Sequence, residues 1–157
     1  MPQDQERKLA FAFFRQHPLM TLTTLSKEGA PQNAAVYTYI DENNCLYFVS
    51  REGTRKYNNI VENSSATLCT YDENVLMFAE VQGSAEVVND KEEAVTILTE
   101  LQKIVESRKS SYWTPPVSQI SDEPYVFFKL TPKEVTFTNY EQSSSEDSKP
   151  MVVNFEM

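Results

Sequence analysis

Apolar and polar residues alternate along several short segments of the chain, and a period of two is typical of half-buried β-strands. In residues 75–88, for example, Ala79 and Val81 alternate with Glu80 and Gln82. Turn-forming residues separate these segments. The pattern predicts about seven strands, at residues 20–25, 33–40, 46–50, 66–71, 75–88, 125–130 and 135–140. We expect the last two to form a hairpin around residues 131–133.

A helical period replaces the alternation in three segments. The first predicted helix covers residues 4–16 and is stopped by Pro18. A short helix follows at residues 55–62. The third begins after Asp90, which resembles the start of a capping box with Glu93. Its apolar stripe consists of Ala94, Ile97, Leu98, Leu101, Ile104 and Val105.

Many strands joined by short turns, with only a few helices between them, predict a mainly β fold: an antiparallel β-barrel or strongly coiled sheet. The 157 residues suit one compact domain, which we place at residues 1–140. Residues 141–157 are a polar C-terminal tail, and a strand-like segment at 151–155 ends it. The pattern leaves the docking of that segment open.

Composition narrows the function classes. The net charge of −9 and the pI near 4.6 argue against nucleic acid or an anionic membrane as a partner. Three glycines form neither a GxGxxG nor a GxxxxGK[ST] phosphate loop. No segment is typical of a membrane span or a signal peptide, so we predict a cytoplasmic protein.

The side chains most often used in catalysis and metal binding are sparse. His17 is the only histidine, and we interpret it as a helix-end cap because a multi-histidine metal site or a catalytic triad would need more partners. Cys45 and Cys69 are interpreted as small buried hydrophobic residues. No metal site is predicted, and the catalytic residues remain unknown.

Where a predicted strand leads into the short helix, the charges oppose the usual preference of a helix start for acidic residues. Three of the chain's 14 cations fall within residues 51–56. Thr54 is a natural N-cap, which places Arg55 and Lys56 in the first helical turn, where the helix dipole disfavours positive charge. A bound anion would reverse that preference, because free N–H groups and both cations would converge on it. A phosphate group fits this arrangement best.

The simpler alternative is a solvated pair of cations on the surface. Glu52 and Glu62 lie close enough in sequence to bridge to Arg55 or Lys56. Charge alone does not decide between a phosphate site and such surface ion pairs.

Several short motifs come in an order that resembles one protein family, the pyridoxamine 5'-phosphate oxidase-like FMN-binding split barrels, and especially its general-stress-protein branch. The similarity runs from about residue 13 to residue 88, with weaker support through residue 140. The motifs are Thr21-Leu22-Thr23-Thr24-Leu25, Gly29-Ala30-Pro31, Leu46-Tyr47-Phe48-Val49-Ser50, Gly53-Thr54-Arg55-Lys56 and Val81-Gln82-Gly83-Ser84-Ala85-Glu86-Val87-Val88.

The resemblance implies a six-stranded antiparallel split β-barrel that forms a homodimer, with FMN in each cleft between the subunits. By resemblance, Arg55 and Lys56 bind the FMN phosphate. The other residues implied at the cofactor are Ser50 and Thr54 at the phosphate, Val49 and the Val36–Tyr37 backbone beside the flavin, and Trp113 from the partner chain. The alternative for Trp113 is a filling role in the core or the interface.

Three departures from the true oxidases bear on the reaction. The family's basic residues at the two ends of the second barrel strand are replaced by Ala34 and Tyr39, and its glutamine near the flavin by Phe78. We therefore expect an FMN-dependent oxidoreductase with an unknown small substrate, which is not a true pyridoxamine phosphate oxidase. The alternative is a non-catalytic FMN-binding or stress-response protein. Deazaflavin and haem remain alternative cofactors.

Overall fold

The computed structural model describes residues 3–108, 124–143 and 150–157. Its helices are α1 (Gln3–Gln16), α2 (Arg55–Glu62) and α3 (Lys91–Ser107). Its strands are β1 (Leu19–Leu25), β2 (Pro31–Tyr37), β3 (Tyr39–Ile40), β4 (Leu46–Arg51), β5 (Ser65–Asp72), β6 (Met77–Val87), β7 (Tyr125–Ser143) and β8 (Pro150–Glu156).

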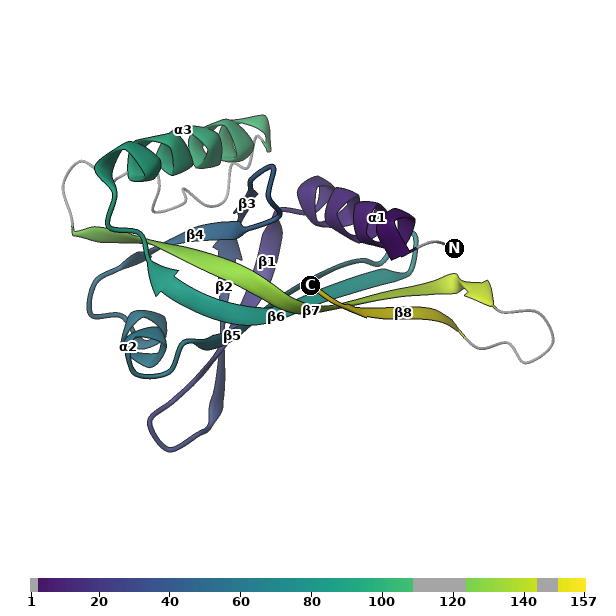
Figure 1. Cartoon of the computed structure of the whole chain (residues 1–157), viewed down its shortest axis with the longest axis horizontal. Coiled ribbons are helices and arrows are strands. Elements are labelled where there is room, and N and C mark those ends of the chain that lie inside the picture. The colour runs from purple at the N-terminus through teal and green to yellow at the C-terminus, as the bar shows by residue number, and fades with distance from the viewer. Residues whose placement is uncertain (1–2, 109–123, 144–149) are drawn as a thin grey trace.

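All eight strands belong to one antiparallel sheet, ordered β2-β1-β5-β6-β7-β4-β3, with β8 added beside β7. The sheet curls so that β2 and β4 approach each other, which gives a half-open barrel (Figure 1). The predicted mainly β, split-barrel fold is confirmed. The resemblance implied six strands and the pattern predicted seven, whereas the described residues form eight. Residues 33–40 divide into β2 and β3, the strands predicted at 125–130 and 135–140 join into β7, and the C-terminal β8 is added.

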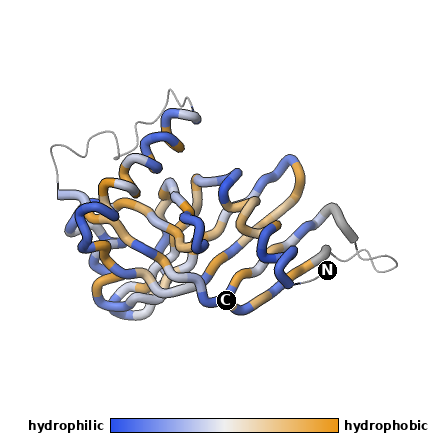
Figure 2. The backbone as a smooth tube through the Cα atoms, turned by 45° about the horizontal axis from the view of Figure 1, so that its top comes forward, coloured by the Kyte–Doolittle hydropathy of each residue, from blue (hydrophilic) through white to orange (hydrophobic). Residues whose placement is uncertain are grey.

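The barrel interior is filled by the alternating apolar residues of the strands. In β1 the buried positions are Met20, Leu22 and Thr24, and the residues between them are more exposed. In Figure 2, hydrophobic (orange) and hydrophilic (blue) positions follow one another along the strands. Helix α1 adds Phe11 and Phe14 to this core. Each fully buried side chain of this size contributes about 1.5–3 kcal/mol, so the pattern of apolar positions fixes the inner face of the sheet.

Helix α3 packs on the outer face of the barrel. Its stripe residues Ile97 and Leu101 are buried against Tyr47 of β4 and Phe127 of β7. Asp90 is the N-cap, as predicted, and its carboxylate accepts from the Glu92 backbone N–H at 3.0 Å.

The predicted hairpin around residues 131–133 is wrong, because residues 125–143 form the single strand β7. On one edge, β7 pairs with β4 as far as Leu130 and with β8 from Glu134, so Pro132 lies in the gap between these two partners. A residue without an N–H is tolerated where the ladder is interrupted. On the other edge, β6 has a register shift at Gly83, where a Cβ would collide with the Thr131 carbonyl.

Two other predicted strands are shorter than expected. Residues 33–40 divide into β2 and β3 at Thr38. The Thr38 backbone N–H donates to the Pro18 carbonyl at 2.8 Å, in register with the β1–β2 pairing. Pro18 has no N–H to return the second bond of this pair, so the ladder ends there. Strand β6 begins at Met77 rather than at Val75, because a turn with Leu76 at φ 50° precedes it.

The C-terminal strand packs against the helix at the start of the chain. The segment whose docking the sequence left open forms β8, and Phe155 is buried in the barrel core. Arg7 of α1 donates to the Glu156 carbonyl at 3.4 Å and lies over the Phe155 ring. Residues near the two ends of the chain therefore pack together.

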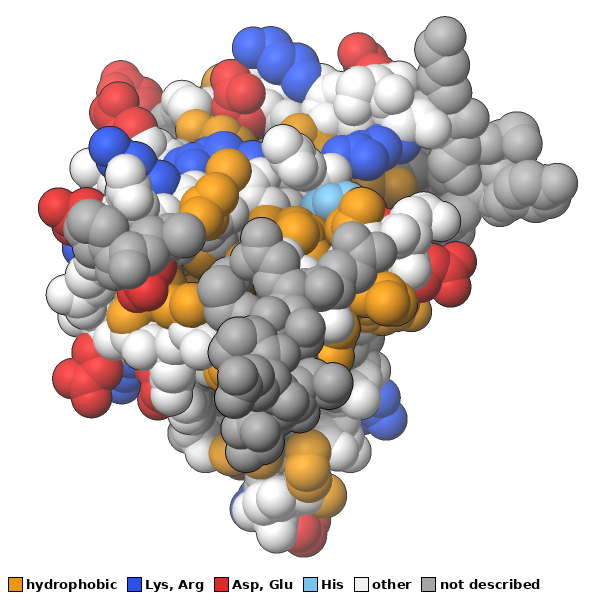
Figure 3. All heavy atoms as spheres, turned by 90° about the vertical axis from the view of Figure 1, so that its right-hand side faces the viewer, with side chains coloured by type: hydrophobic (Ala, Val, Ile, Leu, Met, Phe, Trp, Pro, Cys, Tyr) orange, Lys and Arg blue, Asp and Glu red, His pale blue; other side chains and the backbone are white. Residues whose placement is uncertain are grey.

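The outer face of β1 and β5 leaves apolar side chains exposed. Leu19 is 49% exposed and Tyr71 is 69% exposed, and hydrophobic side chains gather around the only histidine in Figure 3. Among the described residues, no helix combines the length and the apolar character needed to cross a bilayer.

Candidate functional site

The start of α2 is built by a tight turn after β4. Gly53 has a φ of +82°, a conformation that favours glycine. Thr54 is the N-cap, as predicted, but its hydroxyl donates to the Arg51 carbonyl at 2.9 Å and makes no cap hydrogen bond. The Ser50 hydroxyl lies 2.8 Å from the Thr54 hydroxyl. The Thr54 side chain therefore leaves the N–H groups of the first helical turn without a cap.

A buried amide holds α2 against the barrel. Asn59 donates to the Thr24 hydroxyl at 3.0 Å and to the Gln32 side-chain oxygen at 2.9 Å. Asn59 and Thr24 are buried. Because Asn59 lies one turn after Arg55, these bonds fix the cationic end of the helix beside β2.

Arg55 and Lys56 border a small hollow of about 170 Å³ between α2 and β2. Arg55 is exposed and donates to the Asn33 carbonyl at 3.3 Å. Burial, and secondarily the charge of Arg55, lower the pKa of Lys56 below its ordinary value. An anion in the hollow would oppose both effects. The remaining lining comes from Thr24, Gln32, Asn33 and Ala34.

The alternative, surface ion pairs between these two cations and nearby carboxylates, is not observed among the described residues. No salt bridge joins Arg55 or Lys56 to Glu52, Glu62 or any other described acid. The two cations therefore adjoin each other and face β2 with no compensating charge from described residues.

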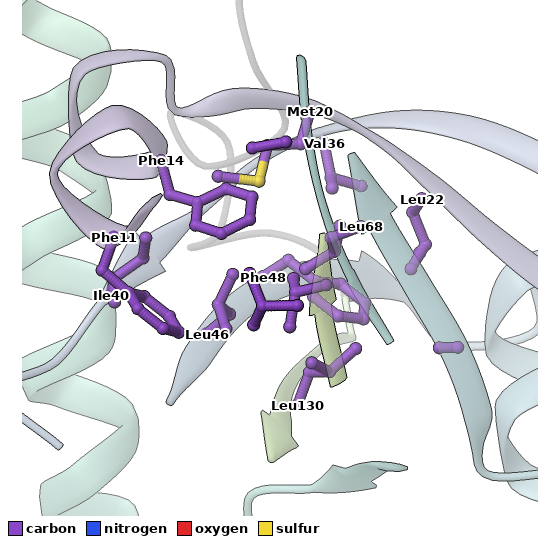
Figure 4. Packing of buried hydrophobic residues seen from close by; sticks show 14 of the residues in the cluster. Phe11, Phe14, Met20, Leu22, Val36, Ile40, Leu46, Phe48, Leu68 and Leu130 are labelled. Atoms are coloured by element: carbon purple, nitrogen blue, oxygen red, sulfur yellow. The ribbon is translucent and has the colours of Figure 1, made fainter. Parts of the chain in front are cut away.

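The other predicted cofactor residues divide between two regions. Val49 and Tyr37 pack against the outer cluster beneath α3. The Val36 side chain points into the barrel core, near Met20 and Leu22 (Figure 4). Only the backbone of Val36 is therefore available on the outer side. Trp113 lies outside the described residues.

Sequence reasoning missed the polar partners on the opposite wall of the hollow. These are Gln32 and Asn33 of β2, and Gln32 accepts from Asn59 of α2. The sequence does contain a signal for Gln32. In β2 it lies on the inward-facing side together with Ala34 and Val36, and a polar side chain at such a position needs a hydrogen-bond partner.

The remaining chemistry-bearing residues do not form a metal centre. No group of three or more His, Cys, Asp or Glu residues with metal-binding geometry occurs within residues 3–108, 124–143 and 150–157. Cys45 and Cys69 are free thiols, half-buried rather than fully buried. Burial raises the pKa of each thiol, which disfavours a reactive thiolate.

Residues 7–139 match the family model for pyridoxamine 5'-phosphate oxidase. The chain therefore belongs to the pyridoxamine 5'-phosphate oxidase-like family. No curated protein matches the sequence.

Several solved structures share the fold. A protein related to general stress protein 26 of B. subtilis, from Clostridium acetobutylicum, is 13% identical with a TM-score of 0.71, and the match covers 99% of this chain and 97% of that one. A pyridoxamine 5'-phosphate oxidase-related, FMN binding protein from Nostoc punctiforme is 14% identical with a TM-score of 0.65, over 100% and 98%. A heme binding protein from Mycobacterium smegmatis is 15% identical with a TM-score of 0.67, over 99% and 59%.

Proposed function

We propose that this protein binds FMN and anchors the FMN phosphate at the start of α2. One observation carries the proposal: Arg55 and Lys56 border a hollow in which no described carboxylate neutralises them. Each charge-assisted hydrogen bond to a phosphate is worth about 1.5–3 kcal/mol. Several such bonds are enough to hold a dianion on a protein whose net charge is −9.

Residues of this chain would divide the binding between two ends of the cofactor. The Arg55 guanidinium, the Lys56 ammonium and the free N–H groups of the first helical turn bind the phosphate, and Ser50 and Thr54 support this end. Tyr37 and Val49, on the outer face, and the Val36 backbone border the flavin. The bound cofactor supplies hydride or electron transfer, and the protein supplies position and electrostatics.

We further propose an oxidoreductase that acts on a small molecule other than pyridoxamine 5'-phosphate. Ala34 borders the hollow, and Tyr39 stacks on Tyr47 with ring centroids 5.7 Å apart. By the resemblance, the true oxidases have basic residues at these two positions that contact phosphate and substrate, and neither Ala34 nor Tyr39 offers that positive charge. The alternative function is non-catalytic FMN binding.

A second copy of the chain is the partner we propose for the exposed outer face of β1 and β5. A symmetric dimer is the commonest way to cover such a surface, and the family resemblance places FMN between the two subunits. Leu19 and Tyr71 would lose their exposure there. The FMN-loaded protein should then sediment as about twice 18.0 kDa at micromolar concentration.

The decisive experiment compares FMN with riboflavin, which lacks the phosphate. In fluorescence titrations, Arg55→Ala/Lys56→Ala should weaken FMN binding by two or more orders of magnitude, at ~1.5–3 kcal/mol per lost bond. Riboflavin binding should change little. Lys8→Ala/Lys103→Ala, which removes two exposed cations from other helices, is the matched control.

The same titration separates the alternatives. Equal losses for FMN and riboflavin would contradict the phosphate assignment. A protein purified with haem, identified by its absorption spectrum and by mass spectrometry of the released group, would contradict FMN as the resident cofactor.

A further inference from the structure

The hollow beside the start of α2 has polar side chains on its β-sheet wall to which the proposed function assigns no role. Thr24 of β1 and Gln32 of β2 are direct cross-strand partners, so their side chains point to the same face of the sheet. Both residues line the hollow. Thr24 is buried and Gln32 is half-buried, and polar side chains at such positions need hydrogen-bond partners.

Asn59 of α2 sets the direction of both side chains. Its side-chain nitrogen donates one hydrogen to the Thr24 hydroxyl oxygen at 3.0 Å and the other to the Gln32 side-chain oxygen at 2.9 Å. Asn59 is only 8% exposed, so water has little access to these two bonds. Because Asn59 occupies the Gln32 oxygen, the Gln32 amide nitrogen is the end of the side chain that remains for another partner.

The Gln32 nitrogen has no acceptor among residues 3–108, 124–143 and 150–157. The hollow is the free space that this side chain borders, and Arg55 and Lys56 belong to the same lining. A guanidinium, an ammonium and a neutral amide therefore surround one space of about 170 Å³. The two cations come from α2 and the amide comes from β2, so the donors stand on both walls.

The side-chain oxygens of the lining are already engaged. Those of Thr24 and Gln32 accept from Asn59, and that of Asn33 accepts from the Thr23 hydroxyl at 2.6 Å. The last bond also holds the Asn33 side chain on the outer face of the sheet, because residues alternate between faces along a strand. Gln32 is therefore the β2 side chain that can donate into the hollow.

We propose that Gln32 is a direct ligand of the bound phosphate, to which its amide nitrogen donates, and that Asn59 is the positioning residue that keeps this nitrogen facing the hollow. This inference rests on the proposed FMN-binding function. Free donors without a free side-chain acceptor suit an oxyanion that carries no proton. The dianionic form of a phosphate monoester, which prevails at neutral pH, is such a group.

The first test observes the Gln32 amide directly by NMR. In isotope-labelled protein, the side-chain NH₂ signals of Gln32 are those missing from Gln32→Met. FMN should shift these signals in a saturable way, whereas riboflavin, which lacks the phosphate, should leave them in place. If FMN binds more tightly than riboflavin but the Gln32 signals do not respond to it, this inference is overturned while the proposed function stands. Equal affinities for FMN and riboflavin overturn both.

The second test measures affinity. Gln32→Met keeps the size of the side chain and removes the donor. FMN binding should weaken by about tenfold or more, the usual effect of losing a hydrogen bond to a charged group, and riboflavin binding should not change. Gln82→Met, which replaces an exposed glutamine on β6, is the matched control. If the amide oxygen faced the hollow instead, Gln32→Met would leave FMN affinity unchanged or raise it, and either result would overturn the inference.

The third test asks whether Asn59 acts through Gln32. Asn59→Ala should weaken FMN binding in the wild-type protein but should have little further effect in Gln32→Met, because no amide nitrogen remains to be positioned. Equal losses in the two backgrounds would assign Asn59 a purely structural role and overturn its positioning role. Asn59→Ser, which keeps a polar group but cannot bridge both side chains, gives the same comparison if Asn59→Ala does not fold.

Discussion

Helices α2 and α3 begin in opposite ways. At α3, the Asp90 carboxylate accepts a backbone N–H, and Glu92 and Glu93 occupy the first turn. At α2, the Thr54 hydroxyl makes no cap bond, the first turn contains no acid, and Arg55 and Lys56 stand there instead. The start of α3 follows the preferences of the helix dipole, and the start of α2 opposes them.

This difference separates a helix start that stabilises the fold from the one to which we assign the proposed phosphate. Glu93 also accepts from the hydroxyl of the buried Tyr47 at 3.3 Å, and the same hydroxyl donates to Asp41 at 2.9 Å. The cations of α2 meet only the Asn33 carbonyl among the described hydrogen-bond partners. The start of α2 lacks the stabilisation that acidic residues and a cap give to α3, and a bound phosphate would supply it.

The largest expected effect comes from giving α2 the charges of α3. Arg55→Glu/Lys56→Glu should abolish FMN binding and raise the stability of the apo-protein by about 1–2 kcal/mol, because each favourably placed charge is worth ~0.3–1 kcal/mol. Flavin titration and urea denaturation measure the two effects. A less stable apo-protein would show that the cations already have a structural role without ligand.

Removing the two cap residues should have unequal effects. Asp90→Ala should lower the free energy of unfolding by about 1 kcal/mol, the usual cost of a lost N-cap. Thr54→Ala should cost less in the apo-protein, because its hydroxyl bonds to Ser50 and to the Arg51 carbonyl at the end of β4 and not to the helix. Urea denaturation of both variants compares them, and equal losses would remove the distinction between the helix starts.

The smallest effect concerns the protonation of Lys56. Its pKa is lower in the folded protein than the ordinary 10.5, so between the two values the unfolded state binds more protons and stability rises with pH. Lys56→Met should therefore raise the melting temperature of the apo-protein near pH 7. The gain should fade as the pH rises toward 10.5. A gain independent of pH would assign it to packing instead.

Much of the fold follows from local pattern. The bounds of α2 agree with the prediction, and α1 and α3 begin and end within a few residues of it. Their apolar stripes, Asp90 and Pro18 are signals that each helix carries in its own residues. The same holds for β1 and β5, where alternation along one strand is enough to define its buried face.

The errors lie where distant partners decide. Pro132 predicts a turn locally, but β4 and β8 leave a gap that accepts it within β7. At the candidate site, the sequence indicated Arg55 and Lys56 because they are cations in the first turn of a helix, where the dipole disfavours positive charge. It could not place Gln32 and Asn33 opposite them, because the pairing of β2 with β1 and the Asn59 bond create that neighbourhood.

The central position of β7 also imposes an order on folding. Strands β2, β1, β5 and β6 form one half of the sheet, and β4 and β3 form the other, but only β7 joins them. During synthesis both halves must wait for residues 125–143 to leave the ribosome. Helix α1 waits longer still, since its contact with Glu156 spans 149 residues of sequence. Such distant contacts make folding slow, and the nascent chain exposes the edges of β6 and β4 throughout that delay, which favours aggregation or chaperone capture.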